Sequence, residues 1–588
     1  MVSSKGRKDT AVVLAWSKMV PLSEGQDPLG VNLRVSARIT GQLLHCITSI
    51  TPRARYFSFF PWCIGEFNRS EKARDPHADF RSGIRLRETA FTLACVLHHE
   101  GQPCEGGSLV GSKEAIKWLQ GNPNKAPHIP RLRFTKNLAL DAYFNSLLNL
   151  GFFAVDQLPD ALGEQTDDLL LTDLELSDTG AKVAATYQTA LNSLRLPNTL
   201  AHRTSGVSQS ELKNWGAAGG LCELAEDHAP DRKLLREIFF NHLQSPGKSH
   251  RFRRDTLVLI LELVRQFEAY NAVLDIDSFN DATYFAEINQ EPDIQHRLIF
   301  PEALDDIVNR WRMFHFHYYI SIALESLFVA IVTSSRAAAI KGISVEQILE
   351  PLAGCGKFVS HRLETKRIRN FLTVTPSEFF SLSGINVPSP DRKSSTALDP
   401  AINVRHPLSE RNLTMLCAEV GPASAEGMAC ALLLLTVTLI RFVRWQSTSY
   451  GLWLSQAVQD AYKDVTAPVI LRELSEISNN FCASSWRELG TFIVRRFVVR
   501  QHEALGYDKS WDGSKTFFHL ENEVIRWLGL SYDEIAVGNA RFSSAIQILI
   551  DLAMVRRTAS DEDTFQLTAD GRRWLRQELQ AIRLNEDH

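Results

Sequence analysis

Residues 545–576 read AIQILIDLAMVRRTASDEDTFQLTADGRRWLR, and this stretch decides the fold that the sequence predicts. An apolar helix comes first, followed by a short strand, a polar turn, a second strand ending in leucine, and a new helix. Residues 143–186 have the same order, because YFNSLLNLGFFAVDQ is followed by an acidic loop and by LELSDTGAKVAAT. A helix, a β-hairpin and a closing helix form the second half of a winged helix. The sequence therefore predicts two winged-helix-like modules.

The two copies agree at the start of the closing helix. Each has a hydroxyl residue that can cap the helix, an acid in the first turn, and a glycine. These residues are Ser177, Asp178 and Gly180 in the first copy and Thr568, Asp570 and Gly571 in the second. We expect a side chain at either glycine to crowd the hairpin.

The fold class predicted for the whole chain is mainly α, with several helical domains around the two modules. A chain of 588 residues is too long for one core. In the first module, helices are expected over 87–99, 112–120 and 138–150. The expected parts are an arginine- and aromatic-rich segment (1–84), the first module (85–192), a helical domain (193–385), a proline-rich linker (386–409), a second helical domain (410–501) and the second module (502–588).

Composition narrows the class of protein. The hydrophobic content of 44% and the net charge of -4 indicate a globular chain without a uniformly basic surface. The nine cysteines include no CxxC pair, which predicts reduced thiols and no zinc site. The apolar run 428–440 is shorter than the roughly 20 residues that cross a membrane, so a buried core helix is expected. We expect a cytoplasmic protein without membrane contact, metal or cofactor.

Arginine clusters are the candidates for nucleic-acid contact, because guanidinium groups suit phosphate. The third helix of the first module is almost uncharged and its wing is acidic, so the second module is the better candidate for DNA. Each cluster also fits a solvated face, or ion pairs with some of the 68 acidic residues. The candidates are Arg541, Arg556, Arg557, Arg572, Arg573 and Arg576 in the second module, and Arg53, Arg55, Arg131, Arg133, Lys136, Arg251, Arg253 and Arg254 elsewhere.

Catalytic motifs are weak. The segment 106–113 (GGSLVGSK) lacks the glycine-lysine step of a P-loop, and His98-His99-Glu100 lacks the HExxH spacing. Arginine and histidine separated by four to six residues mark helical ribonucleases, in which histidine would act on the 2′-hydroxyl and arginine on the phosphate. Three pairs have a matching spacing: Arg310 with His315, Arg312 with His317, and Arg496 with His502. Chance supplies about as many in a chain with 17 histidines, and the aromatic residues around the first two predict a packed core helix.

Residues 29–62, LGVNLRVSARITGQLLHCITSITPRARYFSFFPW, resemble the opening of a bacterial family of unknown function with a RARYFxFxPW signature. The later YFNSLLNLGF is also similar to that family, and the resemblance covers about the first third of the chain. Genes of this family commonly lie near restriction and anti-phage genes, which implies a defence-associated role without assigned catalytic residues. His45-Cys46 departs from the family, where a Pro-Gly turn is frequent. Arg53 and Arg55 within the signature either pair with acids inside the protein or contact a phosphate or partner.

These patterns predict a non-catalytic, DNA-facing or partner-recruiting subunit of a bacterial anti-phage defence system. Double-stranded DNA and other proteins of the same operon are the expected partners. Two alternatives stay open: a helical ribonuclease that uses one of the arginine–histidine pairs, and a protein scaffold without nucleic-acid contact.

Overall fold

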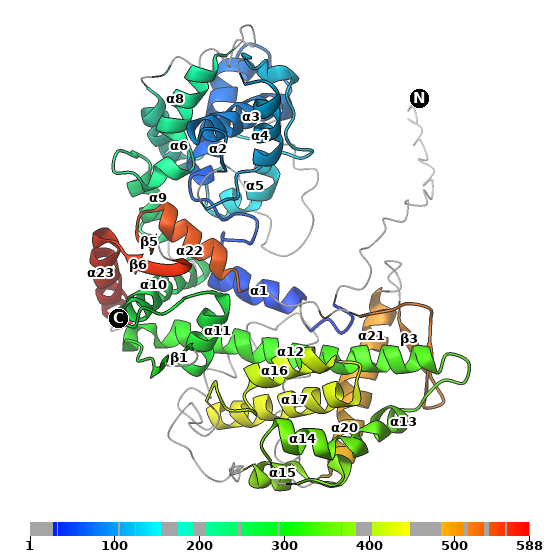
Figure 1. Cartoon of the computed structure of the whole chain (residues 1–588). Helices are drawn as coiled ribbons and strands as arrows, with labels where there is room; N and C mark the ends of the chain where they lie inside the picture. Colours follow the sequence, from blue (N-terminus) through cyan, green and yellow to red (C-terminus); the bar gives the residue numbers. More distant parts are fainter. Residues whose placement is uncertain are drawn as a thin grey trace, which may run out of the picture.

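The computed structural model contains two helical lobes, with helix α1 and the C-terminal elements between them (Figure 1). The upper lobe holds helices α2, α3, α4, α5, α6 and α8, and the lower lobe holds most elements from α12 to β4. The structure describes residues 27–31, 33–103, 106–123, 125–154, 174–192, 194, 207–243, 248–290, 294–365, 367–383, 403–446, 484–509, 516–533, 535, 540–558 and 561–586. The prediction of a mainly helical chain is confirmed for these residues.

The upper lobe is built from the first third of the chain, and the three helices expected in the first module are all present. Its elements are α2 (Tyr56–Phe67), η1 (Asn68–Lys72), α3 (Phe80–His98), α4 (Ser112–Gly121), η2 (Ile129–Arg131), α5 (Ala139–Asn149), α6 (Asp178–Leu191), α8 (Gln209–Gly219) and η4 (Cys222–Ala225).

Helix α2 is the core of this lobe, with ten of its twelve residues buried. The ring of Phe59 stacks on Phe91 of α3 at 4.1 Å between centroids. The indole N–H of Trp62 donates to Gln188 of α6 at 2.6 Å. A buried aromatic side chain removes about 150–250 Å² from water, so the aromatic run of the N-terminal segment forms the centre around which α3, α5 and α6 assemble.

The elements between the lobes come from both ends of the sequence and from residues 232–269 in its middle. Helix α1 packs against α10 and α12, and strand β6 packs against α10. These elements are α1 (Leu33–Leu43), α9 (Arg232–Phe239), α10 (Lys248–Ala269), α22 (Phe542–Asp551), β5 (Val555–Thr558), β6 (Asp561–Leu567) and α23 (Ala569–Glu586).

The lower lobe is organised around α12, a helix of 33 residues that packs along α17. Both helices are long and apolar enough to cross a membrane, but 89% of each apolar window is buried inside the protein. This burial explains their composition, and α17 is the core helix expected at 428–440.

These two helices and the other elements from residue 276 to residue 527 complete this part of the structure. They are α11 (Ile276–Phe285), β1 (Glu287–Gln290), β2 (Ile294–Arg297), η5 (Glu302–Leu304), α12 (Asp305–Ala337), α13 (Val345–Leu349), η6 (Glu350–Cys355), α14 (Gly356–Arg362), η7 (Phe371–Thr373), α15 (Pro376–Leu382), α16 (Glu410–Val420), α17 (Ala425–Gln446), α20 (Trp486–Ile493), η9 (Val494–Val499), α21 (Arg500–Lys509), β3 (Phe518–Glu521) and β4 (Val524–Trp527).

Three antiparallel hairpins account for the named strands of the described residues: β1–β2, β3–β4 and β5–β6. In β5–β6, Val555 pairs with Leu567 and Arg557 with Phe565, as expected of a hairpin that leads into a closing helix. In the first copy, a single antiparallel bridge joins Phe153 to Leu176. The acidic wing between them lies outside the described residues.

Both closing helices begin with the same cap. Ser177 Oγ accepts the backbone N–H of Gly180 at 3.1 Å, and Thr568 Oγ1 accepts that of Gly571 at 3.0 Å. Each cap hydroxyl also donates to a carbonyl at the end of the preceding helix, Gly151 at 2.6 Å and Ala553 at 2.8 Å. The sequence echo therefore corresponds to the same local hydrogen-bond pattern, made twice.

The shared glycine is required by a close backbone approach. A Cβ atom at Gly180 would lie 2.1 Å from the carbonyl oxygen of Phe152, and one at Gly571 would lie 2.0 Å from that of Met554. Real Cβ atoms do not come this close to an oxygen, so any larger residue would push the closing helix off the hairpin. The expected crowding is confirmed at both positions.

The segment before α22 differs from the prediction. Within the described residues, α21 is followed by the β3–β4 hairpin, which was not predicted from the sequence. This hairpin belongs to the lower lobe, because Ile525 bridges to Ile343 beyond the end of α12. The predicted linker lies mostly outside the described residues, which begin again at Asn403.

The prediction that all thiols are reduced is wrong at Cys222, which is disulfide-bonded. The other cysteines of the described residues are free and buried: Cys46, Cys63, Cys95, Cys355, Cys417 and Cys430. Burial raises the pKa of several of these thiols, and it raises the pKa of Cys95 to about 12.

Candidate nucleic-acid interface

Arg53 and Arg55 lie in the protein interior rather than on its surface. Arg53 Nε is 3.0 Å from Asp551 Oδ2, and Arg55 Nη2 is 3.2 Å from Asp231 Oδ1, with all four side chains at most 3% exposed. Arg53 also donates to the carbonyl of Gly107 at 2.8 Å. A guanidinium enclosed in this way cannot reach phosphate, so their assignment to nucleic-acid contact is wrong and the intramolecular alternative is confirmed.

The cluster Arg251–Arg254 is also engaged inside the protein. Arg253 is fully buried and donates to the last carbonyls of α9 at 2.9 Å, which makes it a cap of that helix. Arg251 and Arg254 both pair with Asp255, at 3.4 and 2.7 Å. Burial raises the pKa of Asp255, and these two arginines oppose that shift. Arg253 therefore holds α10 against α9 and is excluded as a phosphate contact.

In the C-terminal module, some arginines serve the fold. Arg541 begins α22 and donates to the carbonyl of Ile47 at 3.0 Å, which fastens that helix to the turn after α1. Arg557 donates to Gln547 on α22 at 3.2 Å, and Arg572 pairs with Glu268 on α10. The contacts of Arg541 and Arg572 join the module to the turn after α1 and to α10, and the contact of Arg557 joins its hairpin to α22.

Four of the predicted cations are exposed on this module: Arg572, which pairs with Glu268, and Arg556, Arg573 and Arg576. Arg556 donates to Gln566 across the hairpin, Arg573 pairs with Asp570 on the same helix, and Arg576 contacts only the backbone carbonyl of Arg572. Because Arg556, Arg573 and Arg576 are exposed, their contact with DNA stays a prediction.

In a winged helix, the third helix reads the bases. Neither of the two third helices here, α5 and α22, exposes basic side chains. In α22, only Ser543 and Ile550 are not buried, because the helix packs against η4, α10 and α11. In α5, the exposed residues are Asp141, Asn145 and Asn149, without a cation.

A different surface gathers unpaired charge on the upper lobe. It comprises α4 and the loop from α4 to α5, and we call its six cations the basic surface: Lys113, Lys117, Lys125, Arg131, Arg133 and Lys136. All six are exposed, and their side chains make no ion pair or hydrogen bond within the described part of the chain. Glu114 is the one carboxylate among the described residues from 106 to 138.

The loop of the basic surface is held by its backbone. Ile129 is buried, and Arg85 of α3 donates to the carbonyls of Thr135 at 3.0 Å and Lys136 at 3.4 Å. A Cβ atom at Gly111, directly before α4, would lie 2.9 Å from Phe134 Cβ, so the first turn of α4 adjoins the loop. These anchors leave the cationic side chains in solvent. Figure 1 shows α4 on the outside of the upper lobe. Gln209, the first residue of α8, donates to the carbonyls of Asn122 at 3.3 Å and Lys125 at 3.0 Å, directly after α4.

A buried carboxylate lies beneath this surface. Burial raises the pKa of Glu88 to about 7, although its oxygens accept the N–H groups of Ala139 at 3.1 Å and Leu140 at 2.9 Å. These are the first N–H groups of α5, so Glu88 satisfies the start of that helix. The adjoining cavity, lined also by Tyr56 and Phe134, has room for about one water molecule and no larger ligand.

The histidines of the three ribonuclease-type pairs are all buried. Burial lowers the pKa of His315 to about 3, and its Nε2 lies 2.8 Å from the hydroxyl of Thr283. His317 is 1% exposed and contacts Ser321 on its own helix at 3.3 Å. Neither ring can reach a 2′-hydroxyl of RNA, which removes these two pairs as catalytic candidates.

His502 is held in one tautomer by two backbone groups. Its Nε2 accepts the N–H of Phe517 at 3.1 Å, so the ring proton lies on Nδ1 and is donated to the carbonyl of Pro28 at 3.1 Å. Both ring nitrogens of His502 are therefore occupied by backbone groups. Arg496 lies on η9, the turn before His502, and is exposed. Arg310 and Arg312, the other arginines of these pairs, contact Asp306 and Asn309 on their own helix at 3.0 and 2.9 Å.

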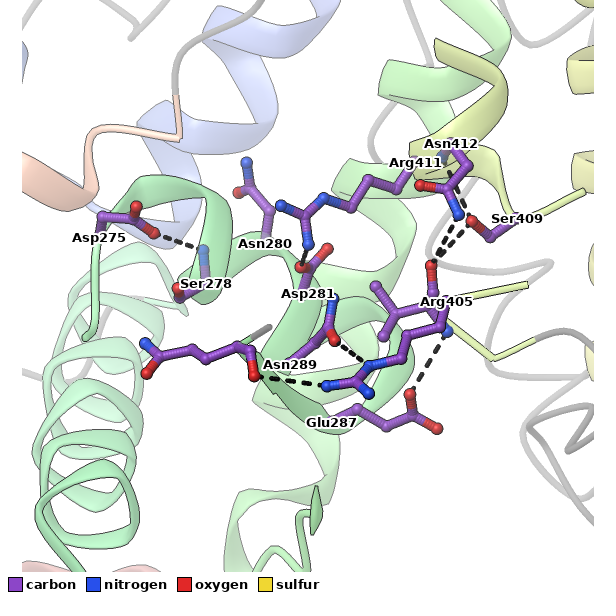
Figure 2. Close-up of polar contacts among 12 residues, drawn as sticks. Asp275, Ser278, Asn280, Asp281, Glu287, Asn289, Arg405, Ser409, Arg411 and Asn412 are labelled. Atoms are coloured by element: carbon purple, nitrogen blue, oxygen red, sulfur yellow. Dashed lines mark hydrogen bonds and ion pairs between the residues drawn. The ribbon is translucent and has the colours of Figure 1, made fainter. Parts of the chain in front are cut away.

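Figure 2 shows a second polar cluster, where residues 403–412 cross α11 and β1. Arg405 donates to Asn289 at 2.6 Å, and Arg411 pairs with Asp281. Burial raises the pKa of Asp281 to about 7, and Arg411 opposes the shift. The contacts drawn in Figure 2 run between neighbouring segments of the same chain, so the cluster fastens α16 to α11. Among the described residues, no group of three potential metal ligands is present.

The sequence prediction included Arg131, Arg133 and Lys136 but missed Lys113, Lys117 and Lys125. A usable signal was present, since Lys113 and Lys117 are four residues apart on a helix and therefore share a face. The scarcity of carboxylates between 106 and 138 was a second signal. Comparison of the chain with models of protein families, with curated proteins and with solved structures finds no match.

Proposed function

We propose that this chain is a non-catalytic, DNA-facing or partner-recruiting subunit of a bacterial anti-phage defence system. The observation that carries the nucleic-acid part of the proposal is the basic surface, with six exposed cations and one carboxylate. Most other surface arginines that were predicted to bind DNA are paired inside the chain, for example Arg572 with Glu268.

The unpaired state of these cations is what favours an external anion. Exposed ion pairs contribute little to stability, so the fold loses little when these cations have no carboxylate partner, and they stay available to an external anion. A local excess of positive charge on a chain with net charge -4 attracts polyanions and raises their association rate. Phosphate is the anion for which lysine and arginine are the usual ligands.

The two helix–hairpin–helix units support the same class of function. We propose that they are winged-helix-like modules, in which the contacts of Gly180 and Gly571 mark the hairpin junction. Because one fold serves many functions, these units alone do not select DNA over a partner protein. The role in defence rests on the resemblance of residues 29–62 to a family whose genes lie near anti-phage genes.

Salt-dependent duplex binding tests the proposal. A fluorescent duplex of 25 base pairs is titrated with the full chain at salt concentrations from 50 to 200 mM. Six phosphate contacts would weaken binding by about 10³-fold over this range. Absence of binding at 50 mM would leave the protein scaffold as the function.

A parallel incubation addresses the enzyme alternative. We expect labelled RNA to stay intact, because His315, His317 and His502 are enclosed by the fold. Cleavage that disappears in His315→Ala or His502→Ala would restore the ribonuclease alternative.

A further inference from the structure

We infer that the basic surface binds the phosphate backbone of a nucleic-acid duplex without reading its bases, and that the C-terminal module takes no part in this contact. The inference rests on the proposed function and specifies its site and ligand. It reverses the sequence-based preference for the C-terminal module.

Neither α22 nor α5, the third helices of the two units, is placed to read bases. A winged helix reads sequence when its third helix enters the major groove and its side chains reach base edges. Helix α22 cannot do so while it is buried between η4, α10 and α11. Helix α5 presents Asp141, Asn145 and Asn149, and Asp141 already pairs with Arg81 at 2.8 Å. Neither helix offers a cation to guide it into a groove.

The basic surface presents lysine and arginine side chains without an exposed large apolar residue beside them. Protein interfaces are centred on buried aromatic or apolar anchors, which supply most of the binding energy. The exposed large apolar residues of the described chain all lie outside 106–138: Ile50, Leu243, Tyr270, Ile299, Ile340, Met415, Phe492, Leu528 and Leu584. A surface of lysine and arginine without such an anchor suits phosphates better than an acidic protein.

The length of α4 matches the spacing of several phosphates along a duplex. Helix α4 has 10 residues and therefore spans about 15 Å. A DNA duplex carries one charge per about 1.7 Å of its axis, so this distance faces several phosphates. Lys113 and Lys117 lie on one face of α4, and the adjoining loop extends the surface through Arg133 and Lys136. Helix α4 alone can therefore follow a backbone over a little less than half of a helical turn of about 34 Å.

Two matched variants locate the contact. The first replaces Arg131, Arg133 and Lys136 with glutamine, and the second replaces Arg556, Arg573 and Arg576 with glutamine. Both remove three exposed positive charges and change the net charge equally. Duplexes of 25 base pairs, two of DNA with unrelated sequences and one of RNA, are titrated with each protein at several salt concentrations.

The expected result is a clear difference between the variants. In the first, the slope of log K against log salt decreases by about 3, one per lost phosphate contact, and binding at 50 mM salt weakens at least 100-fold. In the second, slope and affinity match the wild type. The two DNA sequences bind within about twofold of each other, and the same loss with RNA would extend the site to any duplex backbone.

The outcomes separate the two proposals. Absence of wild-type binding contradicts the nucleic-acid part of the proposed function. Wild-type binding that only the second variant weakens overturns the inference and leaves the function in place, and so does a preference of more than 100-fold for one DNA sequence. Binding of the basic surface to poly-glutamate but to no duplex also overturns the inference.

Discussion

Arg53 and Asp551 are 498 positions apart in sequence and form a buried ion pair of 3.0 Å, with Arg53 Nε as the donor. Asp551 Oδ2 also accepts the backbone N–H of Ala54 at 2.9 Å. The carboxylate at the end of α22 thus fastens the start of α2, the core helix of the upper lobe. This relationship explains why Arg53 of the N-terminal signature is unavailable to a ligand.

Replacement of Asp551 with alanine tests this pair. The variant leaves Arg53 as an uncompensated charge in the interior, and the free energy of unfolding should decrease by about 3–5 kcal/mol. Urea denaturation measures the change. The double variant Arg53→Met/Asp551→Leu should lose less than Asp551→Ala alone, because no buried charge remains. The control Arg573→Ala breaks an exposed pair and should change stability by less than about 1 kcal/mol. Equal, small effects in all three proteins would show that the pair does not stabilise the contact between α22 and the start of α2.

The two hairpin glycines give a second prediction. Gly180→Ala and Gly571→Ala should each destabilise the protein by about 1–3 kcal/mol, because the new methyl group meets a fixed carbonyl. Gly41→Ala in α1 is the matched control, since nothing lies within 4 Å of its Cβ position. A helical glycine without such a contact gains about 0.5–1 kcal/mol on replacement by alanine. Thermal denaturation of the three variants checks the order, and a neutral Gly571→Ala would contradict the close packing.

His242 and Glu578 give a prediction for alkaline pH. The hydrogen bond to Glu578, at 2.6 Å, raises the pKa of His242; partial burial and Arg254 lower it, and Glu237 raises it. A raised folded-state pKa contributes stability that is complete below the ordinary value of about 6.5 and is lost as pH rises through the folded value. The stability difference between wild type and His242→Gln should therefore be larger at pH 6 than at pH 8.5. Urea denaturation at both values measures it, with exposed His77→Gln as the control.

His315 gives the opposite prediction for acid. Burial lowers its pKa to about 3, so the unfolded chain takes up a proton near pH 6.5 while the folded chain does not. Stability is present above about 6.5 and decreases as pH falls, with a slope of about 1.4 kcal/mol per pH unit from this residue. His315→Gln, measured between pH 6.5 and 4, should have a slope smaller by this amount. An unchanged slope would mean that His315 is accessible, which would reopen the ribonuclease alternative.

Several local elements could be predicted from sequence because their causes are local. The closing units follow from a hydroxyl cap, an acid and a glycine at fixed spacing, and both form as expected around Ser177 and Thr568. Helix α17 was predicted from its apolar composition, and α3, α4 and α5 from their spacing. The β3–β4 hairpin was missed because it is stabilised by a distant bridge, Ile525 with Ile343.

The sequence by itself determined the helices, the caps and the places where arginine gathers, because these depend on neighbours within a few positions. The tertiary structure alone decided which cations are free. Arg53 and Arg55 find carboxylates that other segments bring to them, whereas Arg131, Arg133 and Lys136 meet none within the described residues. Charge availability depends on what the fold places within about 4 Å, and that distance connects residues without regard to their separation in sequence.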